Sequence, residues 1–212
     1  MHNLQRTPEP IGLSHYRYGI DQWSNKLPTS VEKTAIWGEI NTMQGNRCAY
    51  CEAELDQSKR HIEHFYQRSR YPQGTFSWPN LFGSCNRDES CGKHKDNCDA
   101  YNQSDLIKPD IEDPEYFFLF ISDGTIAIRG GLNLAEQNRA KETLRIFNLN
   151  PQMGPLRYMR QQAIAGYIQL GEELSDLATL YPEHEWLPLL HSEIAATIDL
   201  PFSTAIKHTL LP

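Results

Sequence analysis

Four cysteines arranged in two pairs constrain the fold of this chain more than any other feature. Cys48 and Cys51 are separated by two residues, and Cys85 and Cys91, further along, are separated by five. Two short hooks of this kind can supply the four thiolates of a tetrahedral structural zinc site, although the second spacing is wider than usual. We therefore predict that these four residues bind Zn²⁺. The fifth cysteine, Cys98, is expected to be an ordinary thiol.

A disulfide framework is the weaker interpretation of the same cysteines. Their number is odd, and the first ten residues contain Pro8 and Pro10 where an export signal would need an apolar core. The longest apolar run, Tyr116–Ile121, is far shorter than the roughly 20 residues needed to cross a bilayer. We expect a cytoplasmic protein without a membrane segment, in which thiols stay reduced.

Composition and charge narrow the range of partners. The chain has 212 residues, of which 39% are hydrophobic, and a net charge of -7, which suits a globular protein of one elaborated domain or two small ones. Overall charge gives no argument for nucleic-acid binding. However, basic residues outnumber acidic ones over 57–95 and again over 124–170. These two islands fit either a small anion-binding site or ordinary solvated faces.

The local patterns predict an α+β protein. A helix is expected over Ser30–Met43, with Ser30 as N-cap and Gly45 as the stop. A strand is expected over His61–Tyr66, and a short helix from Gly92 to about Tyr101. The Asp-Gly pair at 123–124 predicts a hairpin between 116–121 and 126–128. Further helices are expected over 134–147, 156–180 and 186–198. We divide the chain into an arm (1–29), a core (30–105) and a hairpin with a helical region (106–212).

A set of polar residues accompanies the cysteines in a recognisable order. In sequence, the set is Cys48 and Cys51, Glu63-His64, Asn80, Cys85 and Cys91, and His94-Lys95. This resembles the HNH family of ββα-metal nucleases. In that family an acidic residue and a histidine end the first strand, an asparagine lies in the connecting loop, and a helix residue completes a metal site.

The resemblance is closer to one group within that family. The segments CAYCE (48–52), HIEHFYQRS (61–69), WPNLFGSC (78–85) and CGKHKD (91–96) are similar to the HNH proteins of retron and Septu anti-phage systems, the PtuB type. The similarity extends over about 30–165. It implies an ABC-type ATPase partner of the PtuA kind and, in retron systems, a reverse transcriptase with its noncoding RNA and DNA. Residues 1–29 and 106–212 are then candidates for docking to such partners.

The chemical requirements of phosphodiester cleavage suggest roles for Glu63 and His64 on the expected strand. An attacking water must lose a proton, and a cation must stabilise the charge at the phosphate. His64 is the expected general base, because a histidine with a pKa near 6.5 is largely neutral in the cell. Glu63 is expected to bind Mg²⁺ or Mn²⁺ through a carboxylate oxygen. The alternatives are that His64 is a structural histidine and that Glu63 is a surface charge of the hairpin.

The remaining candidates position or bind the substrate. Asn80 is expected to hold the His64 ring or its loop, or to be an ordinary turn residue. His94 is the expected second ligand of the catalytic cation, with Asp96 and Asn97 as substitutes, because Gly92 has no side chain to coordinate. Three basic residues are candidates for phosphate contacts or, equally, for ordinary surface charges: Lys95, Arg68 and Arg70. His61 is expected to face solvent.

Three functions remain open at the level of the sequence. The first is a metal-dependent endonuclease that acts as the effector of a defence complex. The second is a zinc-stabilised adaptor without catalysis, and the third is a stand-alone restriction-type nuclease. The effect of removing His64 distinguishes the first function from the second, because an adaptor would tolerate the loss and a nuclease would not. A phosphate-centred site carries no base code, so DNA and RNA, including tRNA, are both open as targets.

Overall fold

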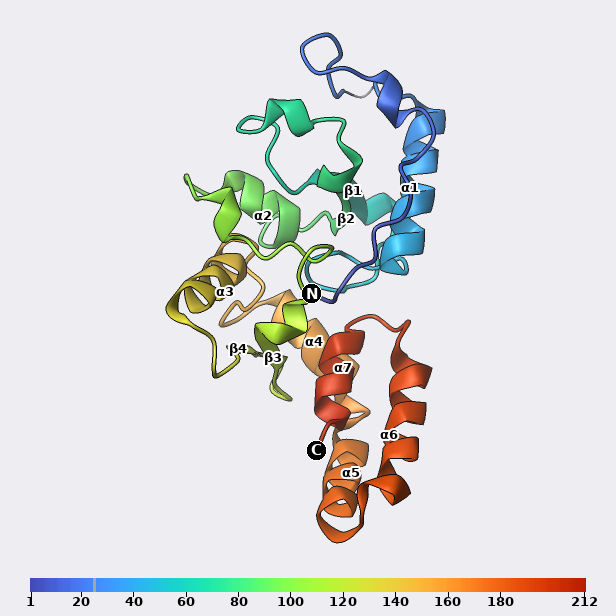
Figure 1. The fold of residues 1–212 in the computed structure, drawn as a ribbon, viewed down its shortest axis with the longest axis vertical. Helices are drawn as coiled ribbons and strands as arrows, with labels where there is room; N and C mark the ends of the chain where they lie inside the picture. The colour runs from blue at the N-terminus through green and yellow to red at the C-terminus, as the bar shows by residue number, and fades with distance from the viewer. Residues whose placement is uncertain (25) are drawn as a thin grey trace.

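The computed structural model describes residues 1–24 and 26–212. These residues form seven α-helices and two antiparallel sheets of two strands, so the predicted α+β class is confirmed (Figure 1). The helices are α1 (Ser30–Gln44), α2 (Cys91–Asn97), α3 (Leu134–Ile146), α4 (Pro155–Ala165), α5 (Ile168–Leu180), α6 (Glu183–Thr197) and α7 (Ser203–Leu210). The strands are β1 (Arg60–His64), β2 (Leu81–Cys85), β3 (Phe118–Phe120) and β4 (Ile126–Ile128).

Helix α1 begins and ends with strong local signals. Thr29, rather than the expected Ser30, is the N-cap: its hydroxyl accepts a hydrogen bond from the Glu32 N–H, and the Glu32 carboxylate accepts one from the Thr29 N–H. This reciprocal capping box satisfies two donors that the first turn leaves unpaired. Gly45 ends the helix in the left-handed conformation, with φ of 58°. The chain then enters the first cysteine pair.

Strands β1 and β2 form an antiparallel pair, and helix α2 follows β2 in the chain. In the antiparallel register, Glu63 lies opposite Phe82 and His64 opposite Leu81. The pair lies between α1 and α2 in Figure 1. Helix α2 ends at Asn97, before the expected Tyr101, because the chain turns into an extended conformation at Cys98.

The second hairpin confirms the Asp-Gly prediction. Strands β3 and β4 are joined by a turn in which Gly124 has a φ of 80°. A side chain at that φ is strained, so glycine suits the position. The first strand is shorter than expected because Tyr116 lies in a short 3-10 turn that Asp113 caps.

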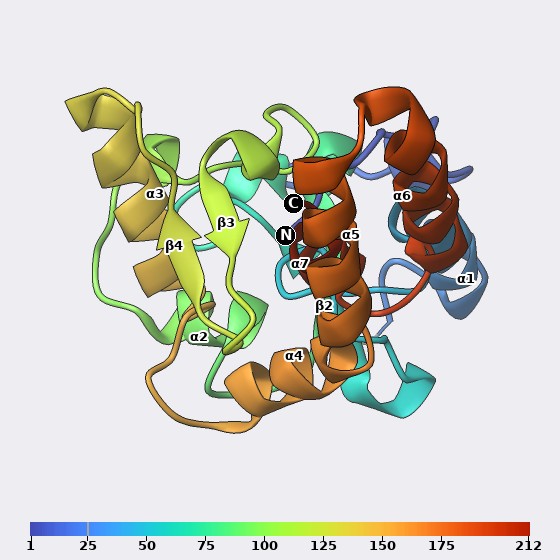
Figure 2. The ribbon, with the colours of Figure 1, turned by 90° about the horizontal axis from the view of Figure 1, so that it is seen from below.

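The C-terminal half differs from the expected pair of helices. The segment 156–180, predicted as one helix, is two helices, α4 and α5, that change direction at Gly166. Glycine is a poor helix former, so a change of direction costs little there. The sequence reading missed helix α7, which packs against α4, α5 and α6 (Figures 1 and 2). Its inward face consists of Thr204, Ala205, Ile206, His208 and Leu210.

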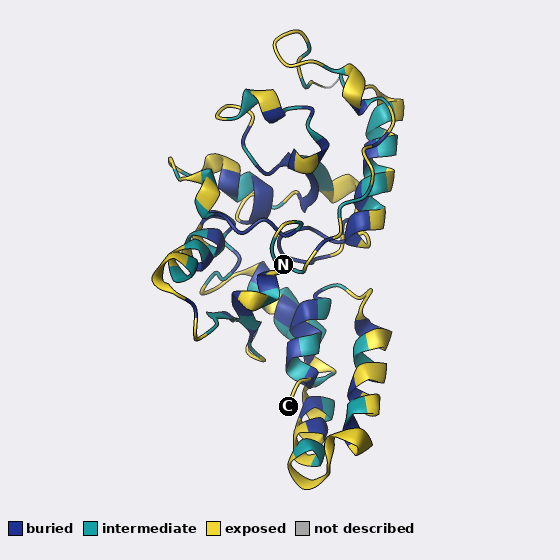
Figure 3. Cartoon of the chain, in the orientation of Figure 1, coloured by how far each residue is buried: buried dark blue, intermediate teal, exposed yellow. Residues whose placement is uncertain are grey.

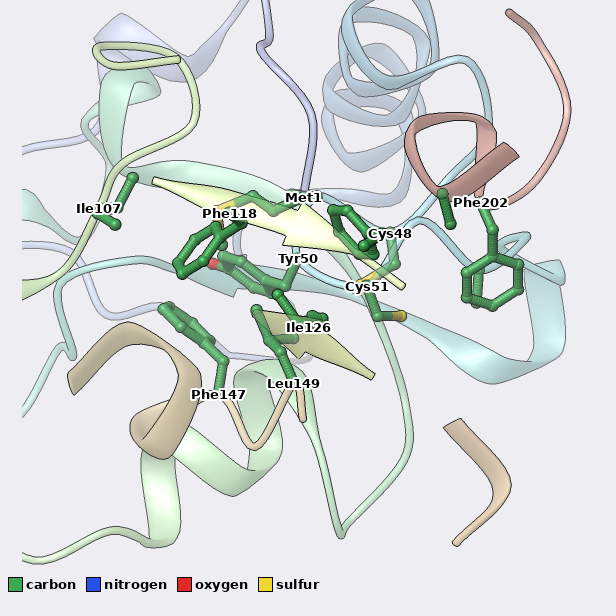
Figure 4. Packing of buried hydrophobic residues seen from close by; sticks show 14 of the residues in the cluster. Met1, Cys48, Tyr50, Cys51, Ile107, Phe118, Ile126, Phe147, Leu149 and Phe202 are labelled. Carbon is green, nitrogen blue, oxygen red and sulfur yellow. The ribbon is translucent and has the colours of Figure 1, made fainter. Parts of the chain in front are cut away.

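One hydrophobic core joins the regions on either side of residue 105. In its centre the rings of Tyr50 and Phe147 stack with centroids 4.2 Å apart, and Phe118 and Leu149 belong to the same cluster (Figure 4). The outer faces of α5 and α6 are largely exposed (Figure 3). In the described part of the chain, no helix combines the length and the apolar character that a bilayer crossing requires.

Candidate active site

The four paired cysteines meet at one buried point. Cys48 and Cys51 follow α1, Cys85 ends β2, and Cys91 begins α2. Their sulfur atoms all lie within 4.8 Å of one another, and the Sγ atoms of Cys51 and Cys85 are 3.9 Å apart. The predicted grouping is therefore confirmed, including its wide second spacing. The five intervening residues of the second hook leave Cys85 and Cys91 close enough to share one centre.

The geometry of this cluster fits a tetrahedral metal ion. Zinc–sulfur bonds of about 2.3 Å place tetrahedral sulfur atoms about 3.8 Å apart. The Cys85 N–H also points at the Cys48 sulfur, 3.4 Å away, as suits a thiolate acceptor. Hydrogen bonds from the neighbouring cysteines, Cys48 first, lower the pKa of the Cys85 thiol. Cys98 lies outside the cluster, with its sulfur 3.5 Å from His94 Nδ1.

His64 is held at the end of β1 in one orientation. Its Nε2–H donates a hydrogen bond to the Thr75 carbonyl at 2.9 Å, which leaves the lone pair on Nδ1. The ring of Trp23 meets the imidazole edge to face, with centroids 4.7 Å apart. Only 7% of His64 is exposed, and burial lowers its pKa to about 4. The side chain is therefore neutral at cellular pH.

Asn80 holds the loop that carries the hydrogen-bond partner of His64. Its amide oxygen accepts the Tyr66 N–H at 2.7 Å, and its Nδ2 donates to the carbonyls of Tyr66 and Gly74. Gly74 directly precedes Thr75, so the buried amide of Asn80 ties both ends of the loop 65–75 together. A buried amide with three partners is costly to remove.

Glu63 is buried and already paired with two basic side chains. Its Oε1 lies 2.8 Å from Lys95 Nζ, and its Oε2 accepts a hydrogen bond from His61 Nε2 at 2.9 Å. Burial raises the pKa of Glu63, but Lys95 and His61 lower it by more, so the carboxylate is ionised. His61, expected to face solvent, instead turns toward this carboxylate.

Lys95 does not lie where a phosphate could reach it. Its side chain is completely buried, whereas the prediction of a phosphate contact requires exposure. The ammonium donates to the His64 carbonyl at 3.0 Å and pairs with Asp96 at 2.6 Å, in addition to Glu63. Burial alone lowers the pKa of Lys95, but Glu63 and Asp96 raise it above its usual value. We therefore correct the prediction: Lys95 is an internal partner of Glu63.

His94 lies on a different face of α2 from the one that meets Glu63. Successive helix residues advance by about 100°, so Gly92 and Lys95 share a face that His94 does not. Its Nδ1 instead donates to the Ile146 carbonyl at 2.9 Å, at the end of α3. The structure therefore does not bring His94 to Glu63. Of the substitutes, Asp96 reaches Lys95, and Asn97 is exposed at the end of the helix.

The expected Mg²⁺ or Mn²⁺ site does not fit this arrangement. The two oxygens of Glu63 face Lys95 and His61, and a Cβ on Gly92 would lie 2.3 Å from Glu63 Oε2. No side-chain ligand can therefore be added at position 92. Within the part of the chain that the structure describes, the closely grouped metal-ligating side chains are those of the four paired cysteines, and Glu63 belongs to no such group.

The two arginines that were expected to contact phosphate, Arg68 and Arg70, are exposed. Arg68 Nη1 donates to the Trp23 carbonyl at 3.3 Å, and the Arg70 guanidinium lies over the ring of Tyr101 at 4.9 Å. Arg68 and Thr75 border a cavity of about 330 Å³ whose other wall is formed by 18–23 of the arm. Both arginines remain free to meet a phosphate from solvent, and that role stays a prediction.

Trp23 and Thr75 are the contributors to the site that sequence reasoning missed. Trp23 stands in the irregular arm, far from His64 along the chain, and Thr75 lies in turn material. No sequence pattern indicated the imidazole of His64 as the partner of Trp23.

The sequence of this chain is similar to those of two known proteins. The chain matches no protein-family model. It is 26% identical to Septu protein PtuB of Bacillus thuringiensis over 152 residues, which cover 68% of this chain and 54% of that protein. It is 28% identical to "Retron Vc95 putative HNH endonuclease" of Vibrio cholerae serotype O1 biovar El Tor over 126 residues, 56% of this chain and 58% of that protein.

The chain is similar to PtuB-type HNH proteins. The resemblance seen in the motifs is thereby confirmed. The chain spans little more than half the length of either PtuB-type relative.

Proposed function

We propose that this chain is an HNH-type endonuclease that hydrolyses phosphodiester bonds of nucleic acid in anti-phage defence. The observation that carries the proposal is the state of His64, which is neutral, fixed by the Thr75 carbonyl and left with its lone pair on Nδ1. The similarity to the retron protein, whose name gives it as an HNH endonuclease, supports the same activity. DNA is the first expected target, and RNA such as tRNA is the second.

The proposed reaction is a hydrolysis in which His64 moves one proton. Nδ1 accepts a proton from water, the resulting hydroxide attacks phosphorus, and the bond to the leaving oxygen breaks. The leaving oxygen takes its proton from solvent or from the imidazolium, which restores the base. A bound phosphate raises the pKa of a neighbouring imidazole, so substrate makes His64 a stronger base than it is in the free protein.

The other residues of the site have supporting roles in this proposal. Asn80 positions the loop of Thr75, and Arg68 and Arg70 contact the phosphate backbone from solvent. Zinc at the four cysteines holds α1, β2 and α2 together and takes no part in the chemistry. The role expected for Glu63, binding of a divalent cation, is an independent question, because the proton transfer at His64 does not require it.

We further propose an ABC-type ATPase of the PtuA kind as the partner, and a reverse transcriptase with its RNA and DNA if the system is a retron. The chain is acidic overall, so a basic surface on the partner would help attract the substrate. A non-catalytic adaptor is the second candidate, because Trp23 covers His64 and Lys95 fills the space at Glu63.

The test compares the wild type with His64→Ala, each with and without the neighbouring ATPase. Plasmid DNA and total RNA are incubated with Mg²⁺, Mn²⁺ or EDTA, and zinc content is measured after each treatment. We expect His64→Ala to reduce cleavage by about 100-fold or more. His191→Ala, at an exposed histidine of α6, is the matched control and should retain full cleavage.

Each outcome decides between the candidates. Cleavage by the chain alone supports the stand-alone nuclease, and cleavage only with the ATPase supports the dependent effector. If folded, zinc-loaded wild type binds the ATPase and cuts neither DNA nor RNA, the adaptor replaces the nuclease.

A further inference from the structure

A cavity of about 330 Å³ lies beside the residues that hold His64. Residues 18–23 of the arm form one wall, and Arg68 and Thr75 belong to the other (Figure 1). Two lining residues also contact the imidazole: the Trp23 ring meets it edge to face, and the Thr75 carbonyl accepts its hydrogen bond. A molecule held in this cavity is therefore next to the proposed general base.

The arm lines the cavity with aromatic and apolar side chains that solvent can reach. Tyr18 is 61% exposed, Ile20 is 75% exposed, and Trp23 is partly exposed. Accessible aromatic rings are surfaces on which proteins stack unpaired bases, because every base has a π-face. The cavities of small-molecule sites begin at about 300 Å³, so this one has room for a single nucleotide.

Two charged residues at the cavity favour a nucleotide over a bare anion. Arg68 donates one N–H to the Trp23 carbonyl, and a guanidinium has five, so further donors remain for a phosphate. Asp21 also lines the cavity, and its Oδ2 accepts the Arg17 N–H at 2.8 Å. A carboxylate repels a phosphate but accepts hydrogen bonds from the N–H groups of a base. The lining therefore suits a group that combines a phosphate with a base.

A base can enter such a cavity only when it is unpaired. In a duplex both faces of each base are stacked on neighbours, and taking a base out of the stack costs free energy. We propose that the cavity between the arm and Arg68 binds one unpaired nucleotide beside the scissile phosphate, with its base on Tyr18 and its phosphate at Arg68. The proposal rests on the proposed function and names its substrate class, a nucleic acid that is single-stranded where it is cut. The cavity is already present, so no part of the chain has to move.

The test measures binding without cleavage, by fluorescence anisotropy on zinc-loaded protein with no Mg²⁺ or Mn²⁺ added. The labelled probes are a short single strand of mixed sequence and its blunt duplex, each as DNA and as RNA. We expect wild type to bind the single strand of at least one sugar type more tightly than its duplex. Tyr18→Ala should weaken single-strand binding by about tenfold and leave duplex binding unchanged, because it removes only the stacking surface.

Tyr181→Ala is the matched control. Tyr181 is 48% exposed at the C-terminal end of α5 and does not line the cavity, so this variant should bind every probe as wild type does. Arg68→Met tests the phosphate contact: it should weaken single-strand binding and reduce the slope of log affinity against log salt by about one. An unchanged His64 titration in Tyr18→Ala shows that its arm is still docked.

Three results overturn the proposal. The first is equal affinity of wild type for single strand and duplex, and the second is wild-type affinity of folded Tyr18→Ala for the single strand. The third is a free nucleoside monophosphate that binds as tightly as the single strand, which would make the cavity a site for a free nucleotide.

Failure of this proposal and failure of the nuclease give different results. A single strand that binds through Tyr18 and is never cut would leave the nucleotide site in place and remove the nuclease. Cleavage of plasmid DNA at the wild-type rate by Tyr18→Ala would keep the nuclease and remove the nucleotide site.

Discussion

At the scale of single residues, surroundings determine what His64 can do. The Thr75 carbonyl selects the tautomer, and burial beside Trp23 keeps the ring neutral. Burial is the largest influence and lowers the pKa of His64. The hydrogen bond to the Thr75 carbonyl and the charge of Glu63 raise it, and Arg68 and Lys95 lower it further. A histidine in solution would be half protonated near pH 6.5, whereas this one holds its lone pair well below that pH.

The pH dependence of His64 follows from this shift. Its pKa is about 4 in the folded state and near 6.5 when unfolded, so the unfolded chain binds more protons between these values. The stabilisation is complete above pH 6.5 and is lost as the pH falls toward 4, at a cost of roughly 3 kcal/mol. We expect the His64 ring of the free protein, followed by NMR, to titrate near 4, and kcat/KM of cleavage, which reports the free protein, to show no decline near 6.5.

Trp23→Ala tests the origin of that shift. Removing the indole admits water to the imidazole, so the pKa of His64 should rise toward 6.5 and the acid limb of cleavage should move with it. Tyr18→Ala, at an exposed aromatic residue of the same arm, is the control and should leave the titration unchanged. An unchanged His64 titration in Trp23→Ala would show that the arm does not set the pKa.

At the scale of elements, helix phase and close packing decide which residues meet. The first turn of α2 is anchored by Cys91 in the cysteine cluster, and this docking turns Gly92 and Lys95 toward β1 and His94 toward α3. The spacing of His94 from the cysteine was readable in the sequence, but the direction of the helix was not. The break between α4 and α5 lies at Gly166, and α7, which the sequence did not indicate, packs against both helices.

Gly171→Ala tests the packing of α5 on α7. A Cβ at position 171 would lie 2.1 Å from the carbonyl oxygen of Thr209, a backbone atom that cannot yield without moving α7. We expect a loss of about 2–3 kcal/mol in the free energy of unfolding, measured with urea. Gly166→Ala is the control: it has open space and a φ of -74°, so it should leave stability equal or slightly higher. Equal stability of the two variants would contradict the close approach.

At the scale of the whole molecule, the cysteine cluster and one core hold distant segments together. The cluster joins the loop after α1, the end of β2 and the start of α2. Tyr50, between two of the cysteines, stacks on Phe147 from the region beyond residue 105. The strands of the site are only five residues long, so they depend on these connections for their position.

Removal of the metal should therefore destabilise the whole chain. We expect the purified protein to contain one zinc ion per chain, and expect chelation or Cys51→Ser to lower the melting temperature by at least about 10 °C. Cys98→Ser is the matched control, because this cysteine lies outside the cluster, and it should retain zinc. Equal zinc loss in both variants, or a chelated protein that melts unchanged, would argue against a structural zinc site.

The sequence by itself determined the features that depend on neighbours along the chain. These are the two cysteine pairs, the Glu-His pair at a strand end, the Asp-Gly hairpin and the resemblance to PtuB-type proteins. Spacing and turn chemistry are local, so they can be read without coordinates. Tertiary structure decided the partners: Lys95 at Glu63, Trp23 over His64 and His94 against α3. Such contacts follow from how elements dock, and docking depends on packing among residues far apart in the sequence.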